Sequence, residues 1–185
     1  MLSSAETELP AWTVTRADRR EHIDRVAALL AQWADAGRVN AAEKKRWLQA
    51  AYLHDALRDA RPSELRSAVP AEFAEWPDLL LHGPAAAARL RSEGFRDEGI
   101  LNAITYHTVG HPDLDAAGRA LYLADFLEPG RNFDPIGRAA WRARMPHDLD
   151  NVLREVLAAR IQHMIASHRP MRSETLAFWN QVAAR

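Results

Sequence analysis

Apolar side chains recur at three- and four-residue intervals along most of this 185-residue chain, and no other feature of the sequence constrains the fold as strongly. Side chains at that spacing share one face of an α-helix, whereas a half-buried β-strand would alternate apolar and polar positions. We find no convincing alternation of the strand type and no repeat of fixed period. The sequence therefore predicts an all-α protein.

Capping residues and helix breakers divide this pattern into successive helices. Short polar side chains satisfy the free N–H groups of a first helical turn, and glycine or proline ends a helix. The expected helix starts are Thr15 with Asp18, Asn40 with Glu43, Asp97, and Asp115. The expected ends include Gly37, Gly94 and Pro129-Gly130. A short helix is predicted over 63–68, and two more amphipathic helices are predicted within 146–169 and 173–185.

The length suits one hydrophobic core with a helical extension. We predict an N-terminal tail over 1–14, a metal-binding core over 15–131, and C-terminal helices over 132–185 that pack on the core. The scattered tryptophans are expected to anchor that packing.

The composition excludes several classes of function. The formal net charge is -1 and 26% of the residues are charged, which does not favour a nucleic-acid partner. No stretch approaches ~18 consecutive apolar residues, and the first residues lack a secretory pattern. We therefore expect a cytoplasmic protein with no membrane partner. Because the chain has no cysteine, any metal must be held by nitrogen and oxygen atoms.

Histidines and aspartates stand at the ends of the successive expected helices, namely His22, His54, Asp55, His82, His107 and Asp125. A lone His-Asp pair is more often structural, but six such residues in this arrangement favour a two-metal hydrolase. Two metals about 3.5–4 Å apart can activate a bridging water and polarise a phosphate. Asp55 can bridge them because a carboxylate has two oxygens. His22, His54 and Asp125 would then hold one ion, and His82 with His107 the other.

Five sequence strings occur in an order that resembles the HD-domain metal-dependent phosphohydrolase superfamily, most closely its YqeK-type symmetrical diadenosine tetraphosphate hydrolases. These strings are Arg19-x-x-His22, Leu53-His54-Asp55, Leu81-His82-Gly83-Pro84, Ala103-Ile104-x-Tyr106-His107-Thr108-x-Gly110, and Leu123-Ala124-Asp125-Phe126-Leu127-Glu128-Pro129-Gly130-Arg131. The resemblance implies a helical HD-domain bundle with a C-terminal extension. It also implies a di-iron centre and hydrolysis of diadenosine tetraphosphate to two ADP, with a hydroxide that bridges the metals as nucleophile.

Several residues around these ligands are expected to act on the substrate. The catalytic set is Asp55, Arg58 and Arg19. The set that contacts substrate is Arg19, Arg58, Thr108, His111 and Arg131. Arg58 stands where the resembling family carries lysine, so the phosphate geometry is expected to differ there, because a guanidinium is a planar fork and an ammonium a point charge. A solvent-facing role for His111 is the favoured alternative. Glu128 is expected to be structural.

Other interpretations of the same residues stay open. Manganese, zinc, cobalt or magnesium are alternatives to iron, because imidazole and carboxylate ligands suit several ions. Another HD-type nucleotidase or phosphomonoesterase, or a non-catalytic nucleotide-binding module, are alternatives to the tetraphosphate hydrolase. The expected partner is a small nucleotide, and the chain is expected to be a monomer or a homodimer.

Overall fold

A computed structural model describes residues 9–184, which form nine α-helices and two short 3-10 helices without any strand. The prediction of an all-α fold is thereby confirmed. The helices are α1 Ala17–Ala36, α2 Ala41–Leu53, α3 Pro62–Ala68, η2 Ala71–Phe73, η3 Asp78–Leu80, α4 His82–Ser92, α5 Glu98–Tyr106, α6 Ala116–Leu127, α7 Pro135–Arg144, α8 Leu149–Ala166 and α9 Ser173–Ala183. Within the same residues, no helix combines the length and the apolarity needed to cross a membrane.

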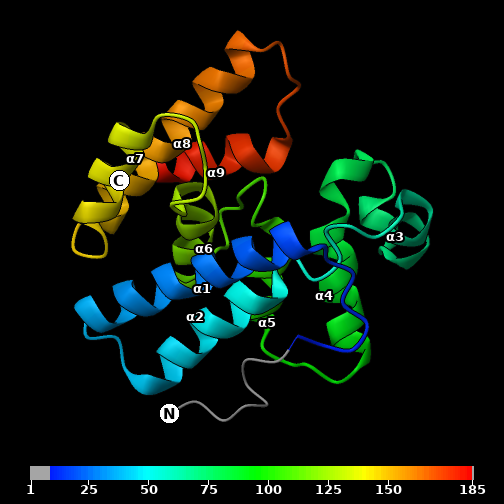
Figure 1. The fold of residues 1–185 in the computed structure, drawn as a ribbon. Coiled ribbons are helices and arrows are strands. Elements are labelled where there is room, and N and C mark those ends of the chain that lie inside the picture. Colours follow the sequence, from blue (N-terminus) through cyan, green and yellow to red (C-terminus); the bar gives the residue numbers. More distant parts are fainter. Residues whose placement is uncertain (1–8, 185) are drawn as a thin grey trace.

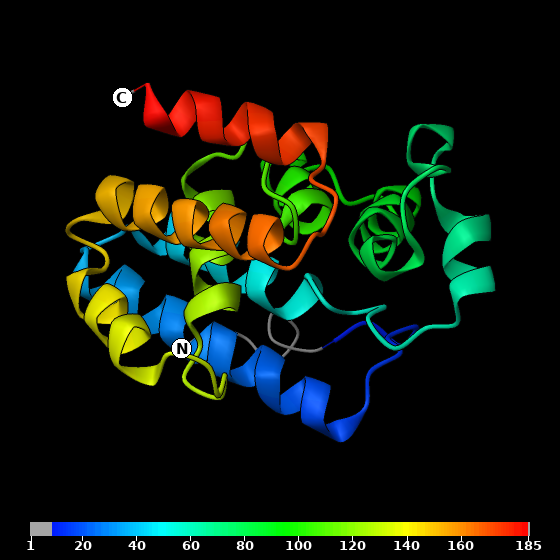
Figure 2. The ribbon, with the colours of Figure 1, turned by 90° about the horizontal axis from the view of Figure 1, so that it is seen from above.

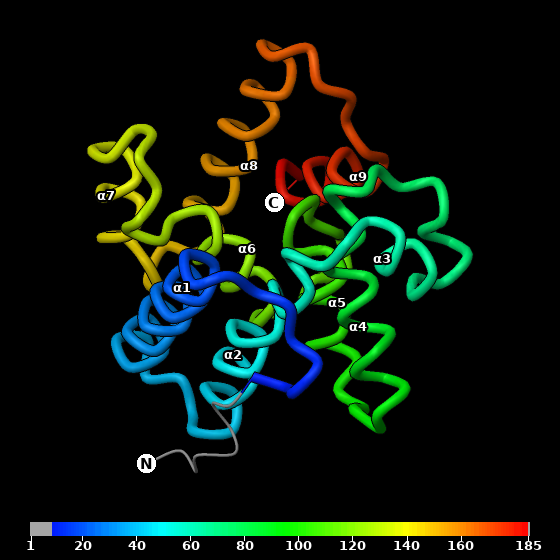
Figure 3. The backbone as a smooth tube through the Cα atoms, turned by 45° about the vertical axis from the view of Figure 1, so that its right-hand side comes forward, coloured from blue at the N-terminus to red at the C-terminus, as the bar shows by residue number. Residues whose placement is uncertain are grey.

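Helices α1, α2, α5 and α6 pack around one apolar core, and α4 lies against α5 (Figure 1). Fully buried side chains of this core include Leu30, Trp33, Ile104 and Leu121. A smaller apolar cluster joins α3, η2 and the start of α4. Helices α7 and α8 pack on α6, and α9 packs on α8 (Figure 2), whereas α3 lies next to α4 and away from α7 (Figure 3). The boundaries of tail, core and extension stay predictions, and residues 1–8 of the tail lie outside the described residues.

Three of the predicted helix starts carry the expected caps. The side chains of Asn40, Asp97 and Asp115 each accept a hydrogen bond from the backbone N–H three residues further on. Arg46 on α2 contacts both Asp97 and Asp115, so that one guanidinium ties together the starts of α5 and α6. These contacts fix the starts of α5 and α6 relative to α2.

The predicted cap at Thr15 is wrong. Helix α1 begins at Ala17 after Arg16, which makes no side-chain cap. The backbone N–H of Arg16 instead donates to the carboxylate of Asp59, 2.8 Å away. A contact that is remote in sequence therefore fixes the residue before the helix, while no side chain caps its first turn, and local pattern cannot reveal such a contact.

Helix α7 was missed by the sequence prediction, although its start carries an ordinary signal. Asp134 caps the helix by accepting from the N–H of Gly137, and Pro135 occupies the first helical position, where its missing N–H costs nothing. The Asp-Pro pair indicated a helix start as clearly as the caps that were recognised.

Gly83, the second residue of α4, lies where the backbones of α4 and α5 come close together. A Cβ at Gly83 would lie 2.5 Å from the backbone oxygen of Ile104, whereas a Cβ at Gly118 in α6 would meet the movable side chain of Leu114 at 2.8 Å. Alanine gains about 0.5–1 kcal/mol of helix stability over glycine, but overpacking against a fixed backbone costs about 1–3 kcal/mol. We expect Gly83→Ala to lower the free energy of unfolding by about 1–2 kcal/mol.

Urea or thermal denaturation measures this difference, with Gly118→Ala as the matched variant and a smaller loss expected for it. Equal stabilities of the two variants would contradict a close backbone contact at Gly83.

Candidate metal centre

Three of the predicted ligand histidines are oriented by the same local contact. His54 and His107 directly follow the last residues of α2 and α5, and His82 follows η3 as the first residue of α4. In each, Nδ1 lies near the carbonyl oxygen three residues earlier, at 2.6 Å from Ala51, 2.7 Å from Ile104 and 3.1 Å from Leu79 respectively. Nδ1 of His82 also lies 3.2 Å from Nη1 of Arg58, a group that can only donate. Carbonyls of a last helical turn lack helical partners, so His54 and His107 each donate an Nδ1–H to one. The unprotonated Nε2 then faces away from the helix end.

The fourth histidine, His22, is oriented by a carboxylate instead. It lies in the second turn of α1, with Nδ1 3.2 Å from Oε1 of the buried Glu128. Glu128 also accepts from Nε of Arg25 and from the N–H of Gly130, both at 2.6 Å. Glu128 therefore positions a ligand, which is more specific than the structural role that the sequence suggested.

The two oxygens of Asp55 face two different pairs of histidines. Oδ1 lies 3.2 Å from Nε2 of His82 and 3.5 Å from Nε2 of His107. Oδ2 lies 3.5 Å from Nε2 of His54 and 3.7 Å from Nε2 of His22. All five side chains are buried, so the carboxylate stands between two sets of imidazole nitrogens.

Asp125 on α6 completes the first set, because its Oδ1 lies 3.1 Å from Nε2 of His22. Two groups of ligand atoms fall within 4.8 Å of one another, namely His22, His54 and Asp125, and His54, Asp55 and His107. His82 joins the second group, since its Nε2 is 3.1 Å from that of His107. The six residues predicted as metal ligands thus lie together.

The donor atoms fit bound cations. Nitrogens that share one ion at about 2.1 Å lie roughly 3 Å apart, and the Nε2 atoms of His82 and His107 have that separation. Nδ1 of His107 donates to Ile104, so its Nε2 carries a lone pair, and either a cation or the Nε2–H of the other His82 tautomer would fill the space between the two nitrogens. Within the described part of the chain, the buried Nε2 of His54 has no hydrogen-bond partner. A cation would satisfy all three nitrogens.

The electrostatics of the cluster favour charged carboxylates and a neutral imidazole. Burial alone would raise the pKa of Asp55, but His54, His107 and His82 hold it well below the usual range. His22 and Arg131 likewise hold the pKa of Asp125 well below its usual range despite burial. Burial lowers the pKa of His54 to about 4. At neutral pH these groups have the protonation states that metal ligation requires.

The proton on His22 behaves differently. Burial would lower the pKa of this imidazole, but hydrogen bonds with Asp125 and Glu128 raise it. Nε2 of His22 points at Oδ1 of Asp125, 3.1 Å away, and an ion bound between them would replace a proton at that nitrogen.

Three predicted arginines surround the cluster. Arg19 donates to Oδ2 of Asp55 at 2.8 Å, and Arg131 donates to Oδ1 of Asp125 at 2.7 Å. Arg58 donates to the backbone oxygen of Leu79 at 2.9 Å, which is the same carbonyl that orients His82. Each guanidinium therefore touches a ligand or the group that orients one.

The two remaining predicted residues are placed differently. Oγ1 of Thr108 lies 3.0 Å from Nε2 of His107, so its hydroxyl faces the cluster. The ring of His111 stacks on Tyr106 with the centroids 4.2 Å apart, and its Nδ1 accepts from the N–H of Asp113. These contacts hold His111 in its own loop.

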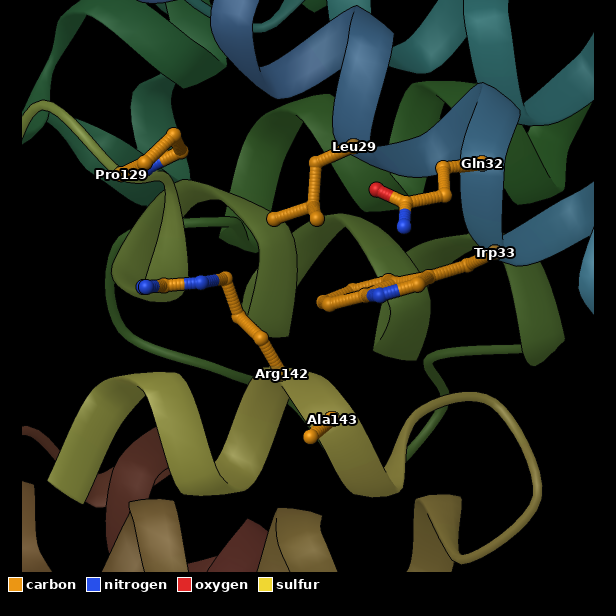
Figure 4. Close-up of a pocket in the computed structure, with 6 residues that line it drawn as sticks. All are labelled: Leu29, Gln32, Trp33, Pro129, Arg142 and Ala143. Atoms are coloured by element: carbon orange, nitrogen blue, oxygen red, sulfur yellow. The ribbon is translucent and has the colours of Figure 1, made fainter. Parts of the chain in front are cut away.

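A pocket of about 280 Å³ lies away from these ligands, between α1 and α7 (Figure 4). It is lined by Leu29, Gln32, Trp33, Pro129, Arg142 and Ala143. Its cation, Arg142, already donates to the backbone oxygen of Leu127 at 2.7 Å. The lining contains no histidine or carboxylate, so the buried cluster is the better candidate site.

Comparisons with known proteins agree with this geometry. The HD domain family model matches residues 19–130. The symmetrical bis(5'-nucleosyl)-tetraphosphatase of Halalkalibacterium halodurans is 29% identical over 154 residues, which are 80% of this chain and 81% of that protein. The protein of the same name from Bacillus subtilis is 30% identical over 146 residues, which are 75% of this chain and 77% of that protein.

A crystal structure shares the fold. It is that of a "predicted HD superfamily hydrolase involved in NAD metabolism" from Clostridium acetobutylicum, with a TM-score of 0.78 and 24% identity over 91% of this chain and 90% of that chain.

The lowered pKa of His54 makes the stability of the metal-free protein depend on pH. Between pH 6.5 and about 4 the unfolded chain binds a proton at His54 that the folded chain does not. The free energy of unfolding is therefore unaffected by the titration of His54 above pH 6.5 and decreases as the pH falls below it. From pH 7.5 to pH 5 we expect a loss of about 2 kcal/mol from this residue.

Urea unfolding in the presence of a chelator tests this effect, with His54→Asn as the non-titrating control. The stability difference between wild type and variant should shift toward the variant as pH falls. A pH-independent difference would show that His54 does not resist protonation.

Proposed function

The chain belongs to the HD domain family and is a metal-dependent phosphohydrolase, and we propose that it cleaves a nucleotide phosphoanhydride at the His/Asp cluster. The observation that carries this proposal is the pair of Asp55 oxygens, each facing Nε2 atoms whose rings are already fixed through Nδ1. A buried carboxylate set between two groups of imidazole nitrogens is suited to bridging two ions.

We propose that His22, His54 and Asp125 hold one ion, that His82 and His107 hold the other, and that Asp55 bridges them. When bound, such ions would lower the pKa of a coordinated water and neutralise charge on the phosphoryl oxygens. Iron is the proposed metal. Manganese, zinc, cobalt and magnesium are the alternatives that elemental analysis of the purified protein would distinguish.

The arginines around the cluster would bind and orient the phosphates. Arg19 and Arg131 keep side-chain exposures of 21% and 36% while they touch Asp55 and Asp125. A polyphosphate at the cluster would therefore meet guanidinium donors without a large rearrangement, and the planar fork can bind phosphate oxygens in pairs. Arg58 and Thr108 would contribute on the side of His82 and His107.

Diadenosine tetraphosphate, cleaved symmetrically to two ADP, is the proposed substrate. Support comes from three curated relatives named as symmetrical bis(5'-nucleosyl)-tetraphosphatases. We further propose a cytoplasmic location and a monomeric or homodimeric state.

Removal of the central ligands tests the metal site directly. His54→Ala and Asp55→Ala should each reduce bound metal from two ions toward one or none and lower turnover by at least 1,000-fold, because the bridge or a first-ion ligand is lost. Elemental analysis and circular dichroism of the anaerobically purified variants check metal content and helical fold. His163→Ala, at an exposed position of α8, is the control and should retain both. Full metal content and activity in either ligand variant would refute the assignment.

A panel of dinucleoside polyphosphates, mononucleotides and simple phosphomonoesters tests the substrate. ADP as the sole product of diadenosine tetraphosphate is the expected outcome. Faster release of phosphate from a mononucleotide would favour a nucleotidase or phosphomonoesterase. Tight nucleotide binding without turnover in metal-loaded protein would favour the non-catalytic module.

A further inference from the structure

We propose that Arg160, on α8 and outside the segment that matches the family model, is a positioning residue of the active site. It would act by holding Thr108 so that its hydroxyl faces the phosphate bound beside His107. The inference rests on the proposed function and adds to it a role for the C-terminal helices.

Arg160 contacts two segments that carry metal-ligand candidates, the one that follows His107 and the part of α6 around Asp125. Its Nη2 donates to the backbone oxygen of Thr108 at 2.6 Å. Its guanidinium carbon also lies 4.6 Å from the centroid of the Tyr122 ring and 5.3 Å from that of Phe126. Tyr122 and Phe126 stand on α6 on either side of Asp125, whereas Thr108 directly follows His107. One cation thus fixes the distance between the segments that carry these two ligands.

The hydroxyl of Thr108 is the group that this contact would set in place. Because Nδ1 of His107 donates to Ile104, its Nε2 can only accept, and the Thr108 hydroxyl 3.0 Å away is the donor. An ion that takes the lone pair of Nε2 would release this hydroxyl. The freed O–H would then be available to a phosphate oxygen beside His107, provided that the Thr108 backbone stays where Arg160 holds it.

A guanidinium is required for this arrangement. It can stack on two aromatic rings and still donate in its own plane, whereas an ammonium is a more strongly hydrated point charge. Lysine at position 160 would keep the charge and lose the combined stacking and donation.

A neighbouring contact supplies the matched control. Thr175 on α9 is buried and donates from Oγ1 to the backbone oxygen of Val109 at 2.8 Å. It anchors the same loop one residue further along but does not touch Thr108. Loss of the Thr175 bond should therefore weaken the loop without misplacing the hydroxyl.

The test compares Arg160→Met, Arg160→Lys, Thr108→Val, Thr175→Val and the double variant Thr108→Val with Arg160→Met, all as metal-loaded full-length protein. We expect Arg160→Met and Thr108→Val each to lower kcat/KM for diadenosine tetraphosphate about 10-fold or more. Arg160→Lys should recover only part of this loss. Thr175→Val should lower Tm while leaving kcat/KM unchanged. In the Thr108→Val background, Arg160→Met should have little further effect on kcat/KM, because the hydroxyl that it positions is already gone.

Binding of ADP, measured by calorimetry, is the readout that does not depend on turnover. Arg160→Met and Thr108→Val should weaken ADP binding by the same factor. Unchanged ADP affinity in Arg160→Met, fully multiplicative losses of kcat/KM in the double variant, or equal kinetic losses in Thr175→Val would overturn the inference. If Arg160→Met does not fold, Arg160→Lys carries the same comparisons. A wild-type protein that neither binds ADP nor hydrolyses a nucleotide would instead overturn the proposed function.

Discussion

The carboxylate of Asp55 is the interaction on which the arrangement of the helix ends depends. Its two oxygens face His54 and His22 on one side and His82 and His107 on the other. These residues belong to α1, the end of α2, the start of α4 and the end of α5. Four elements therefore converge on one buried charge. The apolar core between them keeps water away from this carboxylate. Burial of the charge costs free energy, and bound cations would offset that cost.

Two of the histidines also provide hydrogen-bond partners for the carbonyl groups at helix ends. A helix that ends inside a protein leaves carbonyls without partners, and buried carbonyls without partners are costly. His54 and His107 satisfy such carbonyls with Nδ1 and keep Nε2 for the cluster. The same ring therefore completes the helix end and orients the ligand, which explains why these residues stand at helix ends. Glu128 achieves the equivalent orientation for His22 inside a helix.

Much of the fold and of the ligand set could be predicted from sequence because both depend on local pattern. Helical periodicity, the caps at Asn40 and Asp97, and the histidines at helix ends are all read within a few residues. Contacts between remote residues were not predictable in this way. Asp59 binds the N–H of Arg16 before α1, and Arg160 reaches Thr108 across 52 positions of the sequence. Helix α7 is a different case, because its Asp134-Pro135 start is a local signal of the same kind.

The depth of the ligands governs how an ion could come and go. His22, His54, Asp55, His82 and His107 are each less than 5% exposed, whereas the side chain of Asp125 is 14% exposed and that of Arg131 beside it is 36% exposed. An ion would therefore come and go on the side of Asp125, past the guanidinium of Arg131, without the opening of a helix end. Side-chain motions are faster than local unfolding. The residence time of such an ion would therefore report the strength of its bonds and not the stability of the bundle.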